Sequence, residues 1–327
     1  MRIAYIGVGH WHTHAYFDAV AELGEHKIVG VADPKLEAAE QYAAKSGAKP
    51  FSDYRSMCDE LRPELVFALG RHIDMADEAE FLIESGIPFA MEKPCGVNVS
   101  QIARIEALAR SKNAFAAIPF AYRDSRFREL IAELSPGKEM IYGMFRQVPG
   151  PVSRYYDQGV EWNLDRKLAG GGCTLNLGIH FFDLVKVLAP SGTWSVAAAT
   201  MSSELSGVDV EDFSAVLLEN GGKRATVETA YSFPTPEGEN VMSVNVGGDY
   251  YNWVGRARSI TVTFADGREE THEAGRSQSA YYPKFAIDTI RRVAEGEPPK
   301  ANLADMLAAA QMCESAYRRA GYLDSMA

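Results

Sequence analysis

The 327-residue sequence has little cysteine and no long hydrophobic run. Its four cysteines are far apart and form no C-x-x-C pair, so neither a disulfide framework nor a zinc ribbon is expected. Separated thiols fit a reducing compartment, and we expect a cytoplasmic protein. No apolar stretch approaches the ~20 residues that cross a bilayer, and the first expected strand begins at Arg2, which leaves no room for a signal peptide. We therefore predict no membrane association.

Positive charge is also in short supply. Lysine and arginine number 33 against 44 aspartates and glutamates, which gives a formal net charge of −11. A basic nucleic-acid surface is therefore not expected, and we predict no nucleic-acid partner. Apolar residues (46%) and charged residues (24%) are present in proportions ordinary for a globular protein. At roughly 100–200 residues per domain, the length predicts about two domains.

Short apolar runs alternate with segments of helical spacing through residues 1–121. Such alternation is typical of βαβ crossovers, and it predicts a doubly wound parallel sheet, the Rossmann arrangement. The expected strands are Arg2–Val8, Ile28–Ala32, Leu65–Leu69, Pro88–Met91 and Ala114–Phe120. The expected helices are Thr13–Leu23, Leu36–Lys45, Met75–Glu84 and Gln101–Arg110, the last with Ser100 as its N-cap.

Residues 122–327 show a different pattern, in which strands follow one another without helices between them. The pattern predicts an α+β domain with a large, open-faced and mostly antiparallel sheet. The expected strands are Met140–Val148, Ser195–Met201, Asp212–Leu218, Arg224–Tyr231, Asn240–Val246 and Ser259–Phe264. The expected helices are Arg126–Leu134, Thr174–Leu188, Tyr282–Glu295 and Leu303–Ala320, and a loop is expected over Trp162–Gly172.

Residues 7–12 read Gly-Val-Gly-His-Trp-His directly after the first expected strand. This is close to the G-x-G-x-x-G/A dinucleotide fingerprint, but His12 stands at the small third position. Asp33 ends the second strand 24 residues after Gly9, near the ~20 residues expected for the carboxylate that binds a ribose. Such a carboxylate repels a 2′-phosphate, so the motif favours NAD over NADP. The alternative is a tight turn without a ligand.

Three histidines alternate in the same segment, at His10, His12 and His14. An H-x-H pair after a first strand binds the catalytic metal in barrel hydrolases, so a metal-dependent hydrolase is one alternative. The glycines before the histidines have no use in such a site. A helix that begins near Trp11 should also separate the three side chains. We therefore expect no metal.

Two further segments carry chemically useful residues. Glu92-Lys93-Pro94 ends the fourth strand, where ligands of open parallel sheets bind, and burial would make Lys93 a usable acid or base. An ordinary surface lysine is the alternative. Gly170–Gly172 precede a helix that is apolar nearly all round except at Asn176, His180 and Asp183. These three share one face, which we expect to border a polar cleft unless His180 is a core histidine satisfied by Asp183.

Together these motifs resemble the glucose–fructose oxidoreductase/inositol dehydrogenase/rhizopine catabolism (Gfo/Idh/MocA) family. The resemblance covers essentially the whole chain. It rests on the glycine loop, Asp33, Glu92-Lys93-Pro94, Tyr122-Arg123, the stretch from Gly170 to Asp183, and Asn302-Leu303-Ala304-Asp305 before the last helix.

The resemblance implies NAD(P)-dependent redox of a sugar or polyol by a homodimer or homotetramer. It assigns Lys93 and His180 as the catalytic acid–base pair. The substrate contacts expected from this resemblance are Asn176, Tyr122, Arg123, Trp162 and Asp183. The expected cofactor contacts are Gly7, Val8, Gly9, His10, Trp11, His12, Asp33, Leu69, Gly70, Glu92 and Lys93.

Three positions depart from the family pattern. His12 replaces a small residue, Asn176 replaces the usual aspartate, and Leu69-Gly70 stand where the family usually has Thr-Pro. Our hypothesis is that His180 takes the hydroxyl proton while Lys93 stabilises the developing alkoxide during hydride transfer. A non-catalytic protein of the same fold, which senses cofactor or sugar, is the other alternative.

Overall fold

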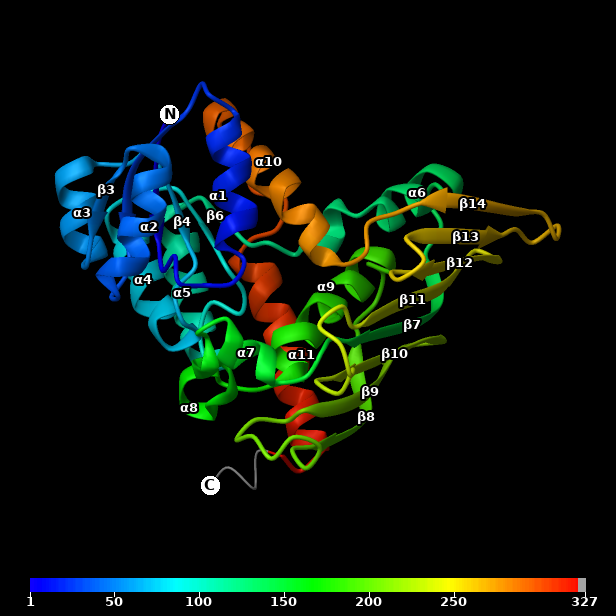
Figure 1. Ribbon diagram of the computed structural model, residues 1–327. Helices are drawn as coiled ribbons and strands as arrows, with labels where there is room; N and C mark the ends of the chain where they lie inside the picture. The colour runs from blue at the N-terminus through cyan, green and yellow to red at the C-terminus, as the bar shows by residue number, and fades with distance from the viewer. Residues whose placement is uncertain (323–327) are drawn as a thin grey trace.

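The computed structural model describes residues 1–322 and contains two sheets side by side (Figure 1). The first sheet is parallel, with strand order β3-β2-β1-β4-β5-β6. Its strands are β1 (Arg2–Ile6), β2 (Lys27–Ala32), β3 (Lys49–Phe51), β4 (Leu65–Ala68), β5 (Phe89–Met91) and β6 (Ala116–Ala117). The helices that connect them are α1 (Thr13–Glu22), α2 (Leu36–Ser46), α3 (Tyr54–Leu61), α4 (His72–Glu84) and α5 (Val99–Lys112). The predicted Rossmann arrangement is confirmed.

The second sheet has the order β14-β13-β12-β11-β7-β10-β9-β8. All neighbouring strands are antiparallel except β7 and β10, as predicted for a mostly antiparallel sheet. Its strands are β7 (Met140–Val148), β8 (Ser195–Ser202), β9 (Phe213–Asn220), β10 (Lys223–Ala230), β11 (Glu239–Val246), β12 (Asp249–Val254), β13 (Ser259–Thr263) and β14 (Glu269–Glu273). The last five residues of the second predicted domain, 323–327, lie outside the described residues.

The remaining helices join the two halves of the molecule. Helix α10 lies beside α1, and α11 runs between α5 and the second sheet (Figure 1). The bounds are η1 (Ala121–Asp124), α6 (Arg126–Leu134), α7 (Ser153–Asp157), η2 (Glu161–Leu164), α8 (Arg166–Ala169), η3 (Thr174–Gly178), α9 (Ile179–Leu188), η4 (Gln278–Tyr281), α10 (Tyr282–Glu295) and α11 (Leu303–Arg319). Within residues 1–322, no helix combines the length and apolar character that crossing a membrane requires.

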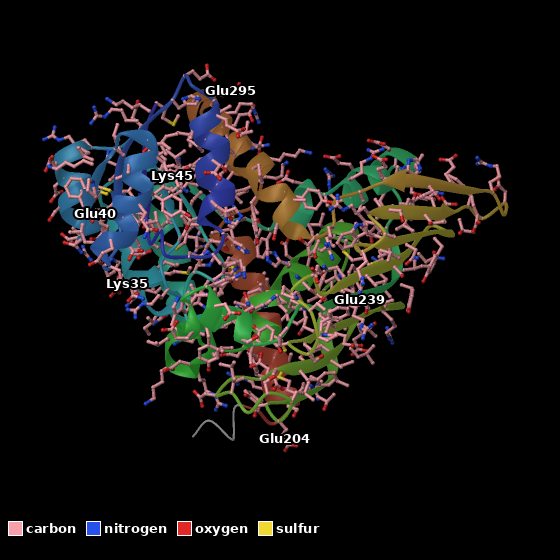
Figure 2. All side chains as sticks on the ribbon, in the orientation of Figure 1. Lys35, Glu40, Lys45, Glu204, Glu239 and Glu295 are labelled. Carbon is pink, nitrogen blue, oxygen red and sulfur yellow. The ribbon has the colours of Figure 1, made fainter. Side chains whose placement is uncertain are left out.

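Side-chain polarity follows the layers. One large core cluster of buried apolar side chains fills both sheets and the helices packed on them. Charged side chains such as Glu40, Lys45, Glu204 and Glu295 are exposed and project from the surface (Figure 2). The hydrophobic effect therefore accounts for the elements that the apolar runs predicted.

Several local expectations were wrong. Asn98, not Ser100, caps α5: its side-chain oxygen accepts from the Gln101 backbone N–H at 2.9 Å. The loop expected over Trp162–Gly172 contains the short helices η2 and α8. Strands β3 and β14 were not predicted, because short or exposed strands carry a weak apolar signal. Strand β12 and helix α3 were not predicted either.

The predicted helix Thr174–Leu188 begins instead with one π-helical turn, η3, before α9. Such turns are rare and occur often at functional sites. The buried Glu211 carboxylate fixes this turn, because it accepts hydrogen bonds from the Gly172 and Thr174 backbone N–H groups at 2.8 and 2.9 Å. The Tyr317 hydroxyl donates to the same carboxylate at 2.8 Å. The loop before η3 is thereby fastened to the second sheet and to α11.

The three glycines before η3 allow close packing within the protein. A Cβ on Gly170 would lie 2.4 Å from the Val97 carbonyl oxygen, and one on Gly172 would lie 2.0 Å from the Glu211 carbonyl oxygen. The neighbours are backbone atoms of the protein.

We expect Gly172→Ala to lower the free energy of unfolding by about 1–3 kcal/mol, because the added methyl group forces the Glu211 backbone to move. Gly222→Ala is the matched control, since nothing lies within 4 Å of a Cβ at Gly222 and its φ is not left-handed. Urea denaturation of both variants measures the difference. Equal stability of the two variants would contradict this account of the loop.

Candidate active site

The larger of two cavities relevant to function lies at the carboxyl ends of β1, β2 and β4. Its volume is about 810 Å³. Among the predicted cofactor contacts, its lining includes Gly7, Gly9, His10, Asp33, Leu69 and Gly70. The buried Val8, together with Trp11, His12, Glu92 and Lys93, does not line it.

The glycine loop packs tightly against the loop after β4. Gly7 has a φ of 71°, and a Cβ there would lie 2.4 Å from the Gly70 backbone nitrogen. Gly70, which departs from the family pattern, therefore lies where the glycine loop contacts the backbone of the loop after β4. At the end of β2, the Asp33 carboxylate accepts from the Gly9 and Lys35 backbone N–H groups, each at 2.8 Å. The carboxylate is thus fixed beside the glycine loop.

A second acid in this cavity, Glu78 on α4, was not singled out from the sequence. Its side chain is buried, and Oε2 has no hydrogen-bond partner among the described residues. Burial, with added repulsion from Asp74 and Asp33, raises the Glu78 pKa to about 8. Glu78 is therefore neutral at pH 7. The only signal for Glu78 in the sequence was that this acid shares a helix face with apolar residues of α4.

The smaller cavity, of about 300 Å³, lies between the two sheets. Lys93 reaches it from the end of β5, and its Nζ donates to the backbone oxygen and to Oδ1 of Asn176 at 2.8 and 2.6 Å. An ammonium has three donors, so one remains for a ligand. Burial lowers the Lys93 pKa to about 8, against the opposing charge of Glu92. The alternative of a surface lysine is wrong, since Lys93 is 2% exposed.

The Asn176 side-chain amide is bound to protein groups, and one of these is the Lys93 ammonium, which it positions. Its Nδ2 donates to the hydroxyls of Tyr155 and Tyr231 at 2.9 and 3.1 Å, while Oδ1 accepts from Lys93. Tyr155 comes from α7, and Tyr231 follows β10. Sequence reasoning missed both tyrosines, because nothing in their spacing shows that they meet at Asn176.

His180 lies one turn beyond Asn176 and is 1% exposed. Neither ring nitrogen has a hydrogen-bond partner within residues 1–322. The ring packs edge-on against Phe120 and Tyr122, and burial and then the charge of Lys93 hold its pKa well below the usual value. The imidazole is therefore neutral, and the alternative in which Asp183 satisfies it is wrong.

Asp183, the third residue of the predicted polar stripe, pairs with Arg123. The two Asp183 oxygens accept from Arg123 Nε at 2.8 Å and Nη2 at 2.5 Å. Arg123 also contacts Asp305 and the Lys300 carbonyl group. Neither member of the pair lines the cavity at Lys93, so the stripe does not border a single cleft. The buried Tyr122, stacked on Phe181, does not line it either.

An aromatic cluster contributes to both cavities. His10 and Trp162 line the larger cavity, and Trp11 lines the smaller one. The His10 and Trp11 rings stack with centroids 3.8 Å apart, and Trp162 lies 6.0 Å from Trp11. Trp162, predicted to contact substrate, thus lines the cavity at the glycine loop. Trp11, predicted to contact cofactor, lines the cavity that contains Lys93.

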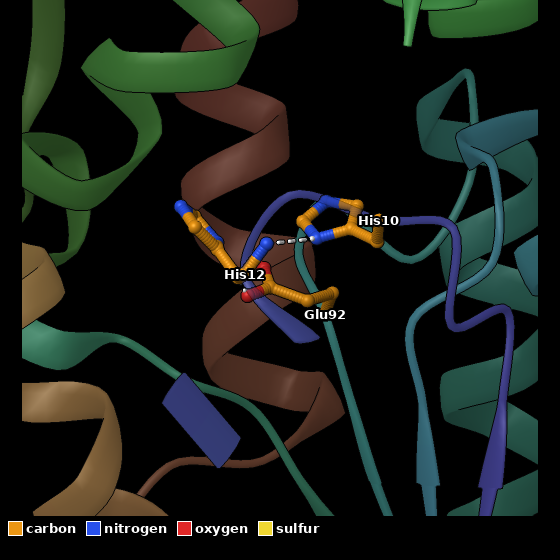
Figure 3. Close-up of side chains that lie close together, drawn as sticks. All are labelled: His10, His12 and Glu92. Atoms are coloured by element: carbon orange, nitrogen blue, oxygen red, sulfur yellow. Dashed lines mark hydrogen bonds and ion pairs between the residues drawn. The ribbon is translucent and has the colours of Figure 1, made fainter. Parts of the chain in front are cut away.

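His10, His12 and Glu92 lie together at the ends of β1 and β5 (Figure 3). One potential ligand atom of each lies within 4.8 Å of the others, so the expectation that a helix separates His10 and His12 is wrong. His14 is exposed and apart from this group. The Nδ1 atoms are already engaged: that of His10 accepts from the His12 backbone N–H at 3.1 Å, and that of His12 lies 2.9 Å from Glu92 Oε1. These hydrogen bonds account for the close approach of His10, His12 and Glu92.

Comparison with known proteins identifies the family. Residues 1–120 match the model "Oxidoreductase family, NAD-binding Rossmann fold", and residues 128–249 match "GFO/IDH/MocA C-terminal domain". The chain belongs to this family. The resemblance inferred from sequence is confirmed, as are the oxidoreductase class and NAD as the cofactor. A hydrolase built on His10 and His12 is set aside.

Individual relatives are distant. The chain is 26% identical over 200 residues to mouse trans-1,2-dihydrobenzene-1,2-diol dehydrogenase, covering 61% of this chain and 58% of the relative, which is less than two thirds of its length. It is 23% identical over 270 residues to D-glucoside 3-dehydrogenase of Escherichia coli (strain K12), covering 76% and 75% of the two chains. A levoglucosan dehydrogenase solved with NADH and levoglucosan superposes with a TM-score of 0.86 at 18% identity, over 98% and 97% of the chains, and so shares the fold.

The buried Glu78 predicts a pH-dependent stability. Its folded pKa of about 8 exceeds the ordinary value of 4.5, so the unfolded chain loses this proton first and stability falls as pH rises between these values. We expect Glu78→Gln to raise the melting temperature at pH 8 but hardly at pH 4.5, at about 1.4 kcal/mol per pKa unit. Glu84→Gln, exposed on the same helix, is the control. Equal gains at both pH values would contradict the assignment.

Proposed function

We propose that this protein transfers hydride between NAD and a carbinol or carbonyl carbon of a sugar, polyol or sugar derivative. The observation that carries the proposal is Lys93, a buried ammonium with a pKa of about 8 on the wall of a cavity beside the glycine loop. The named activities of the mouse diol dehydrogenase, the glucoside 3-dehydrogenase and the levoglucosan dehydrogenase support a hydroxyl-bearing substrate.

The larger cavity fits the cofactor. Gly7 and Gly9 provide a loop that side chains do not obstruct, and the helix that follows offers backbone N–H groups to a pyrophosphate. Among the described residues, the Asp33 carboxylate accepts only from backbone groups, and it suits a ribose diol. Bound NAD supplies a hydride acceptor at its nicotinamide ring. In this proposal His10, Leu69 and Gly70 contact the cofactor. Val8, Trp11, His12 and Glu92 do not line the larger cavity, and they act by positioning the residues that do.

Lys93 and His180 form the proposed acid–base pair. Lys93 donates a hydrogen bond to the reacting oxygen and stabilises the charge that develops on it. His180, neutral and without a hydrogen-bond partner in residues 1–322, accepts the hydroxyl proton. Asn176 holds the Lys93 ammonium in place, and its neutral amide adds no further charge.

Other side chains on the smaller cavity are suited to neighbouring hydroxyl groups. Arg154, Tyr155 and Asn240 line it, and the Arg154 guanidinium is held over the Tyr155 ring at 4.5 Å. We assign them to substrate binding. Trp162 lines the larger cavity, and its ring centroid lies 6.0 Å from that of Trp11 on the smaller one, so we assign it to the cofactor side of the substrate. The Arg123–Asp183 pair with Tyr122 positions the His180 helix.

The proposal also covers the organisation of the chain. Residues 1–121 bind the cofactor, and residues 122–327 supply the substrate site and the contacts between subunits. The apolar side chains of Ile141, Tyr142, Leu217 and Tyr250 are exposed on the second sheet. Burial of such residues favours self-association, and we propose a homodimer or homotetramer formed through this sheet.

The Asp33 assignment predicts cofactor selectivity. In a fluorescence titration of the purified protein, NADH should bind saturably and NADPH much more weakly, because Asp33 repels the 2′-phosphate. Asp33→Ser should weaken NADH and strengthen NADPH, which reduces the preference at least about tenfold. Asp53→Ser, at the cap of α3, is the control. An unchanged preference in Asp33→Ser would overturn the assignment.

The Lys93 assignment predicts a loss of turnover without a loss of cofactor. Lys93→Met should lower kcat by about 10²-fold or more while NADH affinity is kept. The assay follows NADH formation with levoglucosan, myo-inositol and glucose as probe substrates. Lys112→Met, at an exposed lysine that lines neither cavity, is the control for loss of charge. Full activity in Lys93→Met would refute the role, and NADH binding without turnover of any probe would favour the sensor alternative.

A further inference from the structure

His12 borders the smaller cavity and is held by a carboxylate. It is 7% exposed, it lines the cavity that contains Lys93, and its Nδ1 lies 2.9 Å from Glu92 Oε1. In the dinucleotide fingerprint this third position is a small residue, chosen for helix packing. The fold does not need an imidazole there, so its chemistry requires another explanation.

The surroundings of Glu92 decide which ring nitrogen of His12 carries the proton. Glu92 accepts from the Tyr16 hydroxyl at 2.6 Å and from the Lys93 backbone N–H at 3.1 Å. Although burial opposes ionisation, the hydrogen bond from His12 and the charge of Lys93 hold the Glu92 pKa well below its usual value. Because an ionised carboxylate only accepts hydrogen bonds, Nδ1 of His12 must be the donor. Nε2, on the side of the ring away from Glu92, is left as the acceptor (Figure 3).

His180, the proposed base, lacks its own route to solvent. Lys93 is 2% exposed and His180 is 1% exposed, and His180 lines neither cavity. Oxidation of a carbinol releases one proton for each hydride transferred. That proton has to leave the buried pair before the next turnover, and an imidazole that borders the cavity is suited to carry it.

We propose that His12 carries the reaction proton between the Lys93–His180 pair and the solvent in the smaller cavity. During oxidation the hydroxyl O–H bond and the carbinol C–H bond break and a C=O bond forms. The C–H electron pair would leave as hydride to bound NAD, and the proton moves from the pair to His12 Nε2 and then to water. Glu92 retains its bond to Nδ1 and stabilises the imidazolium that forms. Reduction uses the same route in reverse. This inference rests on the proposed function.

The groups around His12 keep it ready to accept a proton. Burial lowers its pKa below the usual value and Glu92 opposes this, so the ring is neutral near pH 7. Groups on two other elements also face it. The titratable groups that face His12 are Glu92 and Lys93 after β5, His10 and His14 beside it in sequence, Tyr282 on α10 at 4.4 Å between ring centroids, and His180 on α9.

Removal and chemical rescue of the imidazole test the proposal. His12→Ala restores a small residue at the third position of the fingerprint, so NADH affinity and the substrate KM should stay near those of the wild type. With levoglucosan, myo-inositol or glucose as the probe, kcat should fall about 10²-fold. Added imidazole should restore a large part of kcat in this variant and leave the wild type unaffected. A structural role for His12 would not produce such rescue.

A second variant keeps the ring and changes the group that binds its Nδ1. In Glu92→Gln the side-chain amide donates to His12 Nδ1, which moves the ring proton to Nε2, and kcat should fall although His12 remains. His272→Ala is the matched control, because it removes an imidazole on β14 that lines neither cavity, and it should keep wild-type kcat. Neither variant replaces Lys93 or Asn176.

The outcomes separate this inference from the proposed function. If the wild type turns over a probe and His12→Ala keeps full kcat, or loses kcat without rescue by imidazole, the inference alone is overturned. If Lys93→Met retains full activity, or the wild type turns over none of the three probes, the proposed function is overturned and this inference with it.

Discussion

The hydrogen bonds between Lys93 and Asn176 are the contact on which the site depends. Lys93 belongs to the parallel sheet, and Asn176 belongs to the π-helical turn packed against the second sheet. The two meet because a buried ammonium must find acceptors, and Asn176 offers both its backbone and its side-chain oxygen. The cavity at this junction therefore has one wall from each sheet.

The geometry of Asn176 depends in turn on a buried carboxylate farther away. Glu211 binds two backbone N–H groups of the loop that leads into η3 and the hydroxyl of Tyr317. Glycines at 170–172 let this loop approach its neighbours without side-chain clashes. The polar network thus continues from α11 through η3 to Lys93, and each buried group in it has a partner. Such satisfied networks fix one conformation.

The elements with strong patterns were predictable, and those with weak patterns were not. Buried strands such as β1 and β4 read as continuous apolar runs, whereas β3 and β14 are short or half exposed and carry no such signal. Lys93 was found because its motif ends a strand where ligands of parallel sheets bind. Arg123 and Asp183 were expected at the substrate, yet they pair with each other, since helical spacing does not reveal which neighbour satisfies a charge.

The sequence by itself determined the Rossmann sheet, the glycine loop with Asp33, the mostly antiparallel second sheet and the family, because these depend on local periodicity and on short motifs. Only the tertiary structure decided that Tyr155 and Tyr231 hold Asn176, and that Glu92 holds His12. These partners are separated by up to 80 residues. Their contacts arise from the packing of the two sheets and the helices between them, which no local pattern encodes.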